Sequence, residues 1–270
     1  MKHTFWLLLL LPAAAAAGEK AKGDEIRTDR LNYFLNAAFG RYGAGPGRGL
    51  LMERSGVRMR LAGAPKDSTQ VGAYSHFSLA GDFEVSAAYE VLSLGKPSTG
   101  YGASFGFAVH TQGRAGSVMV CRSCGSDGVE AVGVTRELPK EGGGFDYEAQ
   151  SFPTRAKKGR LAIRRSGDRV TVLAAEKAAV PAPLASFTFS TDPVYQVRVY
   201  ADGGGDPVTV DGRLSDLHIR ADHINGAATP PDAGWSWTTW LLLASCGLLA
   251  VGGGLVVRRR WAGRADAGEE

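Results

Sequence analysis

Short stretches in which apolar and polar residues alternate recur along residues 50–222, and they constrain the fold more than any other feature of the chain. Such alternation is typical of β-strands with one buried face. Turn residues separate the stretches at short intervals, and no amphipathic helical pattern lies between them. Glycine supplies 37 of the 270 residues, as expected where tight turns join many short strands. We therefore expect an all-β fold, a sandwich of two antiparallel sheets.

The clearest hairpin is predicted at residues 160–176, where two alternating runs flank a Ser-Gly-Asp turn. Other strands are predicted within residues 50–61, 70–79, 82–94, 101–111, 116–124 and 185–222. The sandwich domain is expected to cover residues 50–224, and residues 18–49 form an N-terminal segment leading into it. Part of that segment, residues 24–39, could form a short helix.

Four stretches of this domain carry a resemblance to a known family: "GDFEVSAAYEVL", "GYGASFGFAV", "GRLAIRRSGDRVTVLAA" and "VDGRLSDLHIRAD". Over residues 50–222 the chain resembles an uncharacterised bacterial secreted or membrane-anchored family, a domain of unknown function within the concanavalin-like (laminin-G/glucanase) superfamily. The resemblance implies a concanavalin-like β-sandwich with an extracytoplasmic, carbohydrate-related role. It implies no catalytic residue.

The first 17 residues have the layout of a secretory signal peptide. A basic start is followed by a short apolar run and then by alanines, with Ala15 and Ala17 at the positions expected before a cleavage site. The apolar run is too short for a permanent membrane anchor. We expect residues 1–17 to be removed on export.

A second apolar segment near the C-terminus predicts a membrane span. Residues 240–257 carry no charge, and as a helix they would be about 27 Å long, close to the hydrocarbon thickness of a bilayer. Tryptophans border the segment on one side and Arg258, Arg259 and Arg260 on the other, which places the arginines in the cytoplasm. We expect a stalk at residues 225–236, one transmembrane helix at 237–257 and a cytoplasmic tail at 258–270.

Two alternatives concern this C-terminal span. A surface-sorting signal that is cleaved after export has a similar layout, but the usual motif before the span is absent, so permanent anchoring in the cell membrane is preferred. Ala250 and Gly254 form a small-xxx-small pair that could bring two helices together as a dimer.

Charge excludes one class of partner. The formal net charge is +4, of which the predicted signal peptide and the tail contribute +1 each, so the exported part carries about +2 and is close to neutral. This balance gives no reason to expect nucleic-acid binding. A basic run at residues 155–169 could bind an anionic polysaccharide or lipid headgroups, although solvated strand faces are the simpler interpretation.

Three carboxylates on one predicted strand, Asp82, Glu84 and Glu90, raise the question of glycoside hydrolysis. Glycosidases need two carboxyl groups about 5 to 9.5 Å apart. Glu84 and Glu90 are six residues apart on an extended strand, which is about 20 Å. We therefore expect solvent-facing carboxylates and name no catalytic residue, with a divergent glycosidase as the less favoured alternative.

Cys121 and Cys124 form a lone C-x-x-C sequence. In an exported domain a structural disulfide between them is plausible, as are free thiols. A zinc site would require two further ligands nearby, and a redox role usually requires a helix N-terminus. Neither is predicted here.

Calcium is the one cofactor that the sequence allows. The loops at residues 201–212 and 220–223 gather four aspartates that could bind Ca²⁺ at the rim of the sandwich: Asp202, Asp206, Asp211 and Asp222. Aspartate is equally a normal turn residue, so both interpretations stay open.

We expect a non-catalytic binding module, with a glycan or another component of the cell envelope as its ligand. Tyr74, Tyr101 and Tyr200 could stack on sugar rings, or could belong to the core. The alternative is a structural or adhesive envelope protein that contacts other proteins, which an exposed apolar patch without a groove would favour.

Overall fold

The computed structural model describes residues 23–27, 38–43, 45, 48–53, 56–62, 70–111, 116–177 and 180–226. The predicted signal peptide, transmembrane helix and tail, and nearly all of the stalk, lie outside these residues. Within the described residues, no helix is long and apolar enough to span a bilayer. All of them belong to one unit, Met1–Gly226.

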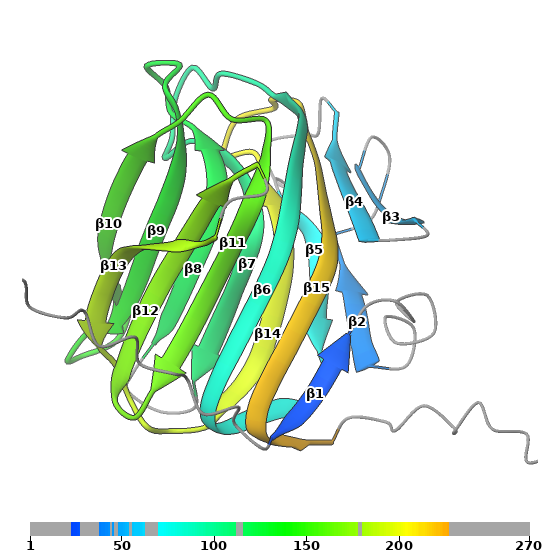
Figure 1. The fold of residues 1–270 in the computed structure, drawn as a ribbon. Coiled ribbons are helices and arrows are strands. Elements are labelled where there is room, and N and C mark those ends of the chain that lie inside the picture. The colour runs from blue at the N-terminus through cyan, green and yellow to red at the C-terminus, as the bar shows by residue number, and fades with distance from the viewer. Residues whose placement is uncertain are drawn as a thin grey trace, which may run out of the picture. The chain divides into compact units, whose positions relative to one another are not determined.

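The strands pair antiparallel in two layers, here called the front and back sheets after the view in Figure 1. The front sheet is ordered β3 (Arg48–Glu53), β4 (Gly56–Leu61), β15 (Val210–Asn225), β6 (Ser78–Leu94), β11 (Lys158–Ser166), β12 (Arg169–Glu176) and β13 (Ala182–Thr188). Beside β4, the short strand β1 (Asp24–Arg27) also pairs with β15. The back sheet is ordered β2 (Phe39–Tyr42), β5 (Gln70–Ser75), β14 (Val194–Asp202), β7 (Ala103–Thr111), β8 (Ser117–Cys124), β9 (Glu130–Pro139) and β10 (Phe145–Pro153).

The two layers face each other across the apolar core and meet at one edge. Val194 of β14 pairs with Leu79 at the start of β6, which links the layers into one hydrogen-bonded network. Between the layers, the fully buried ring of Phe105 on β7 packs against Gly212 on β15, where an added Cβ would lie 2.5 Å from the ring. The expected all-β, antiparallel fold is thus confirmed, and its two layers form a sandwich.

Strand β6 shows how the alternating sequence builds this core. Phe83, Val85 and Ala87 are buried between the sheets, while Glu84 and Glu90 lie on the outer face. The 17-residue strand runs the length of the front sheet, between β15 and β11. The predicted separation of apolar and acidic residues on this strand is confirmed.

The N-terminal segment contributes more to the sandwich than its sequence predicted. Residues 24–27, placed in a possible helix, instead form β1, which pairs with β15. Edge pairing with β15 buries Ile26, and this tertiary contact outweighs the helical tendency of an isolated segment. The predicted hairpin at residues 160–176 is confirmed as β11 and β12.

Candidate functional site

Strand register gathers aromatic and polar side chains on the outer face of the back sheet. On β14 residues 196, 198, 200 and 202 face outward, because Val197, Val199 and Ala201 are fully buried between the sheets. Strands β5 and β2 extend this face on one side and β7 on the other. We define the tyrosine face by these residues: Tyr42, Gln70, Tyr74, Tyr101, His110, Tyr195, Arg198, Tyr200 and Asp202.

Two half-buried tyrosines at one side of this face form an aromatic pair. The rings of Tyr42 on β2 and Tyr74 on β5 lie with centroids 6.4 Å apart at an angle of 34°. Each ring covers a glycine of the neighbouring strand: a Cβ at Gly72 would lie 2.7 Å from the Tyr42 hydroxyl oxygen, and one at Gly40 would collide with Tyr74. The glycines therefore allow the rings to lie close against the sheet as a platform.

Tyr200 lies at the centre of β14, between glycines of β5 and β7 in the register. Its phenol interacts with the thiol of Cys121 on β8, and burial raises the pKa of Tyr200 well above its ordinary value. Burial likewise raises the pKa of the Cys121 thiol, and raises that of Tyr42 to about 12. At neutral pH these groups are uncharged O–H and S–H groups.

Asp202 fixes one end of the tyrosine face. Its carboxylate accepts hydrogen bonds from Gln70 Nε2 at 2.7 Å, from the Tyr101 hydroxyl at 2.8 Å and from the backbone N–H of Gly204 at 2.8 Å. Tyr101 is held by its hydroxyl while its residue remains 75% exposed. This arrangement presents the tyrosine side chain to solvent at a defined position.

The other end of the face is built around His110 of β7. Its ring lies 6.2 Å from that of Tyr195, measured between centroids, and it pairs in the register with Gln196. Burial, followed by the positive charge of Arg198, lowers the pKa of His110 to about 4. His110 is therefore neutral at physiological pH.

These features suit binding better than acid–base chemistry. A general base works best with a pKa near the working pH, whereas the pKa values of Tyr42 and His110 are displaced to about 12 and about 4. Two carboxylates on this face are Asp202 and Glu137. In the register Asp202 lies level with Ser123 of β8, through Ser104 of β7, whereas Glu137 of β9 pairs with Ser117 of β8. Ser123 and Ser117 are six residues apart on β8, which is about 20 Å along the strand. The two carboxylates are too far apart to act as a glycosidase pair.

All three tyrosines predicted from the sequence lie on the tyrosine face, with Tyr74 and Tyr200 on adjacent strands and Tyr101 at the end held by Asp202. The prediction missed Tyr42, His110 and Arg198. Arg198 could have been found from the alternation "VYQVRVYAD", in which every second residue is polar or aromatic. Tyr42 and His110 could not, because only the register of distant strands brings them to this face.

The four predicted calcium ligands lie apart and already accept protein hydrogen bonds. Arg58 donates to both oxygens of Asp211 at 2.7 and 2.6 Å, and Asp222 accepts the backbone N–H of Asp82. Asp206 accepts the backbone N–H and hydroxyl groups of Ser98 and Thr99. In the part of the chain that the structure describes, no three acidic, histidine or cysteine residues are placed to hold a metal ion, so these aspartates do not form the predicted set.

The predicted disulfide is not formed, since Cys121 and Cys124 are both free thiols. Residues three apart on a strand point to opposite faces. Cys121 accordingly faces outward, next to Tyr200, and Cys124 is buried on the other side of the sheet. The same alternation that predicted strand β8 thus rules the bond out.

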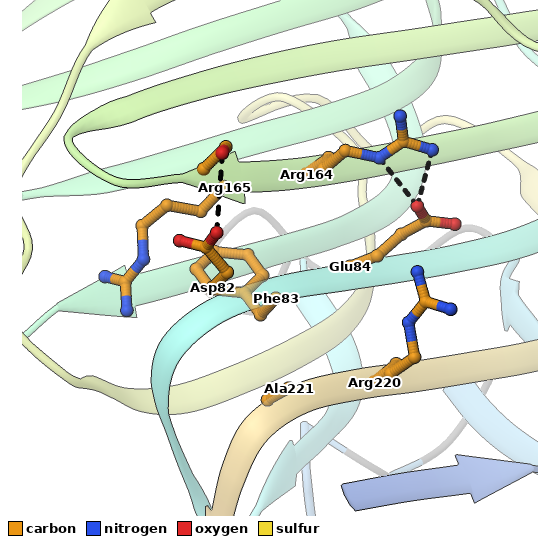
Figure 2. Close-up of a pocket in the computed structure, with 8 residues that line it drawn as sticks. Asp82, Phe83, Glu84, Arg164, Arg165, Arg220 and Ala221 are labelled. Atoms are coloured by element: carbon orange, nitrogen blue, oxygen red, sulfur yellow. Dashed lines mark hydrogen bonds and ion pairs between the residues drawn. The ribbon is translucent and has the colours of Figure 1, made fainter. Parts of the chain in front are cut away.

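A charged pocket opens on the front sheet, where β6, the β11–β12 hairpin and β15 meet (Figure 2). Its carboxylates are engaged within the protein. Arg164 Nε donates to Glu84 at 2.7 Å, and the backbone N–H of Gly167 donates to Asp82 at 2.7 Å. Arg220 points its guanidinium toward the same pocket.

Ion pairs continue across the outer face of the front sheet. Glu90 pairs with Lys158 at 2.8 Å and with Arg213, which lowers the pKa of Glu90, and Arg213 also pairs with Glu53. The carboxylates of β6 that suggested a glycosidase are therefore partners in a charge network, and the two outer faces of the sandwich differ sharply in chemistry.

Solved structures share this fold at low sequence identity. A functionally unknown protein from Saccharomyces cerevisiae aligns with a TM-score of 0.50 and 12% identity, covering 69% of this chain and 97% of its own. A legume lectin-like domain from Entamoeba histolytica aligns with a TM-score of 0.50 and 10% identity, covering 69% of this chain and 91% of its own. The carbohydrate-binding module CBM66 from Bacillus subtilis is more distant, with a TM-score of 0.41 and 12% identity over 68% of this chain and 96% of its own.

These similarities concern the fold alone, a β-sandwich. None of the curated proteins matches this sequence. A family model does match, over residues 37–234, and it describes the C domain of a protein of unknown function, DUF1583. The match covers most of the chain, including the whole tyrosine face, and the chain therefore belongs to the DUF1583 C-domain family.

Proposed function

We propose that this chain is a non-catalytic glycan-binding module of the concanavalin-like class, and that the tyrosine face is its binding surface. The observation that carries the proposal is the arrangement of Tyr74, Tyr101 and Tyr200 on one face, with the hydroxyl of Tyr101 held by Asp202. Tyrosine combines an apolar ring face with a polar tip, which suits sugars, whose rings have apolar faces and hydroxyl edges. Uncharged phenols and a neutral histidine supply hydrogen bonds without demanding a charged ligand.

The module is proposed to act outside the cytoplasm, on a single membrane anchor. The signal-like residues 1–17 and the uncharged segment before Arg258 support this location. A protein of this layout would hold its sandwich near a glycan or another component of the cell envelope. Protease treatment of intact cells would test it, since the sandwich should be digested while a tag after residue 270 stays protected.

The competing hypotheses each have a distinguishing feature. For the glycosidase alternative, the candidate carboxylates are engaged within the protein: Glu84 and Glu90 lie in ion pairs, and Asp202 accepts three hydrogen bonds. The protein-contact alternative would be favoured by a continuous apolar patch. Exposed large apolar side chains instead come from several separate elements, among them Leu51, Leu92 and Phe145.

The test is equilibrium binding of the full chain to a panel of polysaccharides, with calcium and with chelator. Tyr101→Ala should weaken binding about tenfold, which corresponds to about 1.4 kcal/mol. Because Tyr101 is largely exposed, its removal leaves the core intact. Arg164→Gln on the front sheet is the control and should bind like the wild type. Absence of binding across the panel would overturn the proposal and favour a protein-contacting envelope component.

A further inference from the structure

Arg198 stands near the middle of the tyrosine face without an acidic partner. Its Nε donates to Oε1 of Gln196 at 2.5 Å, and none of the described residues places a carboxylate within ion-pair distance of it. Two arginines on the front sheet are paired with a carboxylate, Arg58 with Asp211 and Arg164 with Glu84. The charge of Arg198 is therefore uncompensated on its own face.

Arg198 is half-buried, and its neighbours on the two adjacent strands differ. In the register it lies between Tyr74 of β5 and Ala108 of β7, and the next outward residue of β7 is Gly106. An added Cβ at Gly106 would collide with the carbonyl oxygen of Val120, so this position has no side chain to cover the arginine. One flank of Arg198 is the ring of Tyr74, and the other is Ala108, which is buried and carries only a methyl group.

The charge acts on the groups around it. The positive charge of Arg198 contributes to lowering the pKa of His110 below its ordinary value, and it opposes the effect of burial on Tyr42. A ligand that brings an anionic group to this position would form charge-assisted, bidentate hydrogen bonds with the guanidinium of Arg198.

We infer that the glycan bound by the tyrosine face is acidic, and that Arg198 binds its carboxylate or sulfate group while Tyr74 contacts the adjoining sugar ring. This inference rests on the proposed function and narrows its ligand class. Carboxylate and sulfate share the oxyanion chemistry that a guanidinium recognises. The two oxygens of a planar carboxylate can accept two parallel N–H bonds from a guanidinium. We therefore expect a polyuronate to bind more tightly than a sulfated glycan.

Binding of the full chain to four soluble polymers tests this inference, all in the presence of chelator. The probes are polygalacturonate, its carboxyl-reduced form, dextran sulfate and dextran. Wild-type protein should bind polygalacturonate at least tenfold more tightly than the carboxyl-reduced form, because reduction changes the ligand while leaving the protein untouched. Preference for dextran sulfate over dextran, without preference for polygalacturonate, would assign the site to sulfated glycans instead of uronates.

Protein variants then locate the effect. Arg198→Gln should lose at least tenfold in affinity for polygalacturonate and little in affinity for a neutral glycan. Arg198→Lys should have an intermediate affinity for polygalacturonate, because lysine keeps the positive charge but cannot donate two parallel hydrogen bonds to a carboxylate. Arg164→Gln should match the wild type. Equal wild-type affinity for polygalacturonate and its reduced form would overturn the inference while leaving glycan binding intact. Failure to bind any polymer, including the wider panel, would overturn the proposed function as well.

Discussion

The buried arginine Arg165 shows how one side chain can hold the edge of this sandwich together. It is 2% exposed, and its guanidinium donates to the carbonyl oxygens of Gly81, Ser190 and Asp192. It also lies 4.8 Å from the ring centroid of Phe83. The start of β6 is thereby joined to the loop before β14.

Replacing Arg165 with methionine should lower the free energy of unfolding by about 3 kcal/mol, because the carbonyls would lose their buried donors. The neighbouring Arg164→Met removes only a half-exposed ion pair with Glu84 and should cost less than about 1 kcal/mol. Urea unfolding of the full chain measures both. Equal losses for the two variants would contradict this account of Arg165.

His110 predicts a pH dependence of stability. Its pKa is about 4 in the folded state against an ordinary value of 6.5, so the unfolded chain binds the proton more readily. Folding stability should therefore be unaffected above pH 6.5 and fall between pH 6.5 and 4, by up to about 3 kcal/mol.

Comparison with His110→Gln isolates this effect, since carboxylates titrate in both proteins. The free energy of unfolding of the variant, measured from pH 7 to pH 4, should fall less steeply than that of the wild type. Parallel curves for the two proteins would show that His110 is not held neutral by burial.

At the scale of elements, the contact between β7 and β15 sets the spacing of the two layers. Gly212→Ala would place a Cβ 2.5 Å from the ring of Phe105 and should destabilise the fold by about 1–3 kcal/mol. The loss should be smaller in the background of Phe105→Leu than in the wild type. Gly49→Ala, whose Cβ would meet no atom closer than 4.0 Å, serves as the control in thermal unfolding. Additive losses for Gly212 and Phe105 would contradict a direct contact.

Alternation along the chain was enough to predict the strands and the class of fold. It placed the apolar residues of β6 inside, because a strand with one buried face repeats every two residues. It was not enough for β1, whose short sequence becomes a strand only by pairing with β15, far away in the chain. The local sequence pattern therefore predicts most strands, whereas pairing with a distant strand decides whether an ambiguous segment forms a strand or a helix.

The candidate site was predictable only in part for the same reason. Tyr200 and Tyr74 stand out as aromatics in alternating strands, but their closeness depends on the register of β14 with β5. His110 comes to the same face through β7. Of the two states that the sequence left open for Cys121 and Cys124, the structure has the free thiols, since the two residues lie on one strand with opposite orientations.

For the whole molecule, the two outer faces divide the chemistry between them. The front sheet carries several ion pairs, such as Glu84 with Arg164 and Glu90 with Lys158. The back sheet presents neutral tyrosines around a single uncompensated arginine, Arg198, among the residues that define the tyrosine face. A hydroxyl-rich, acidic ligand fits the second face and has little to gain on the first.

The most direct test of this account is a crystal structure of the chain with an acidic oligosaccharide from the binding panel. We predict that the sugar lies on the back sheet, with its carboxylate at Arg198 and a ring against Tyr74. Ligand in the front-sheet pocket between Arg164 and Arg220, or at the loops that hold Asp206, would contradict the assignment of the tyrosine face as the binding surface.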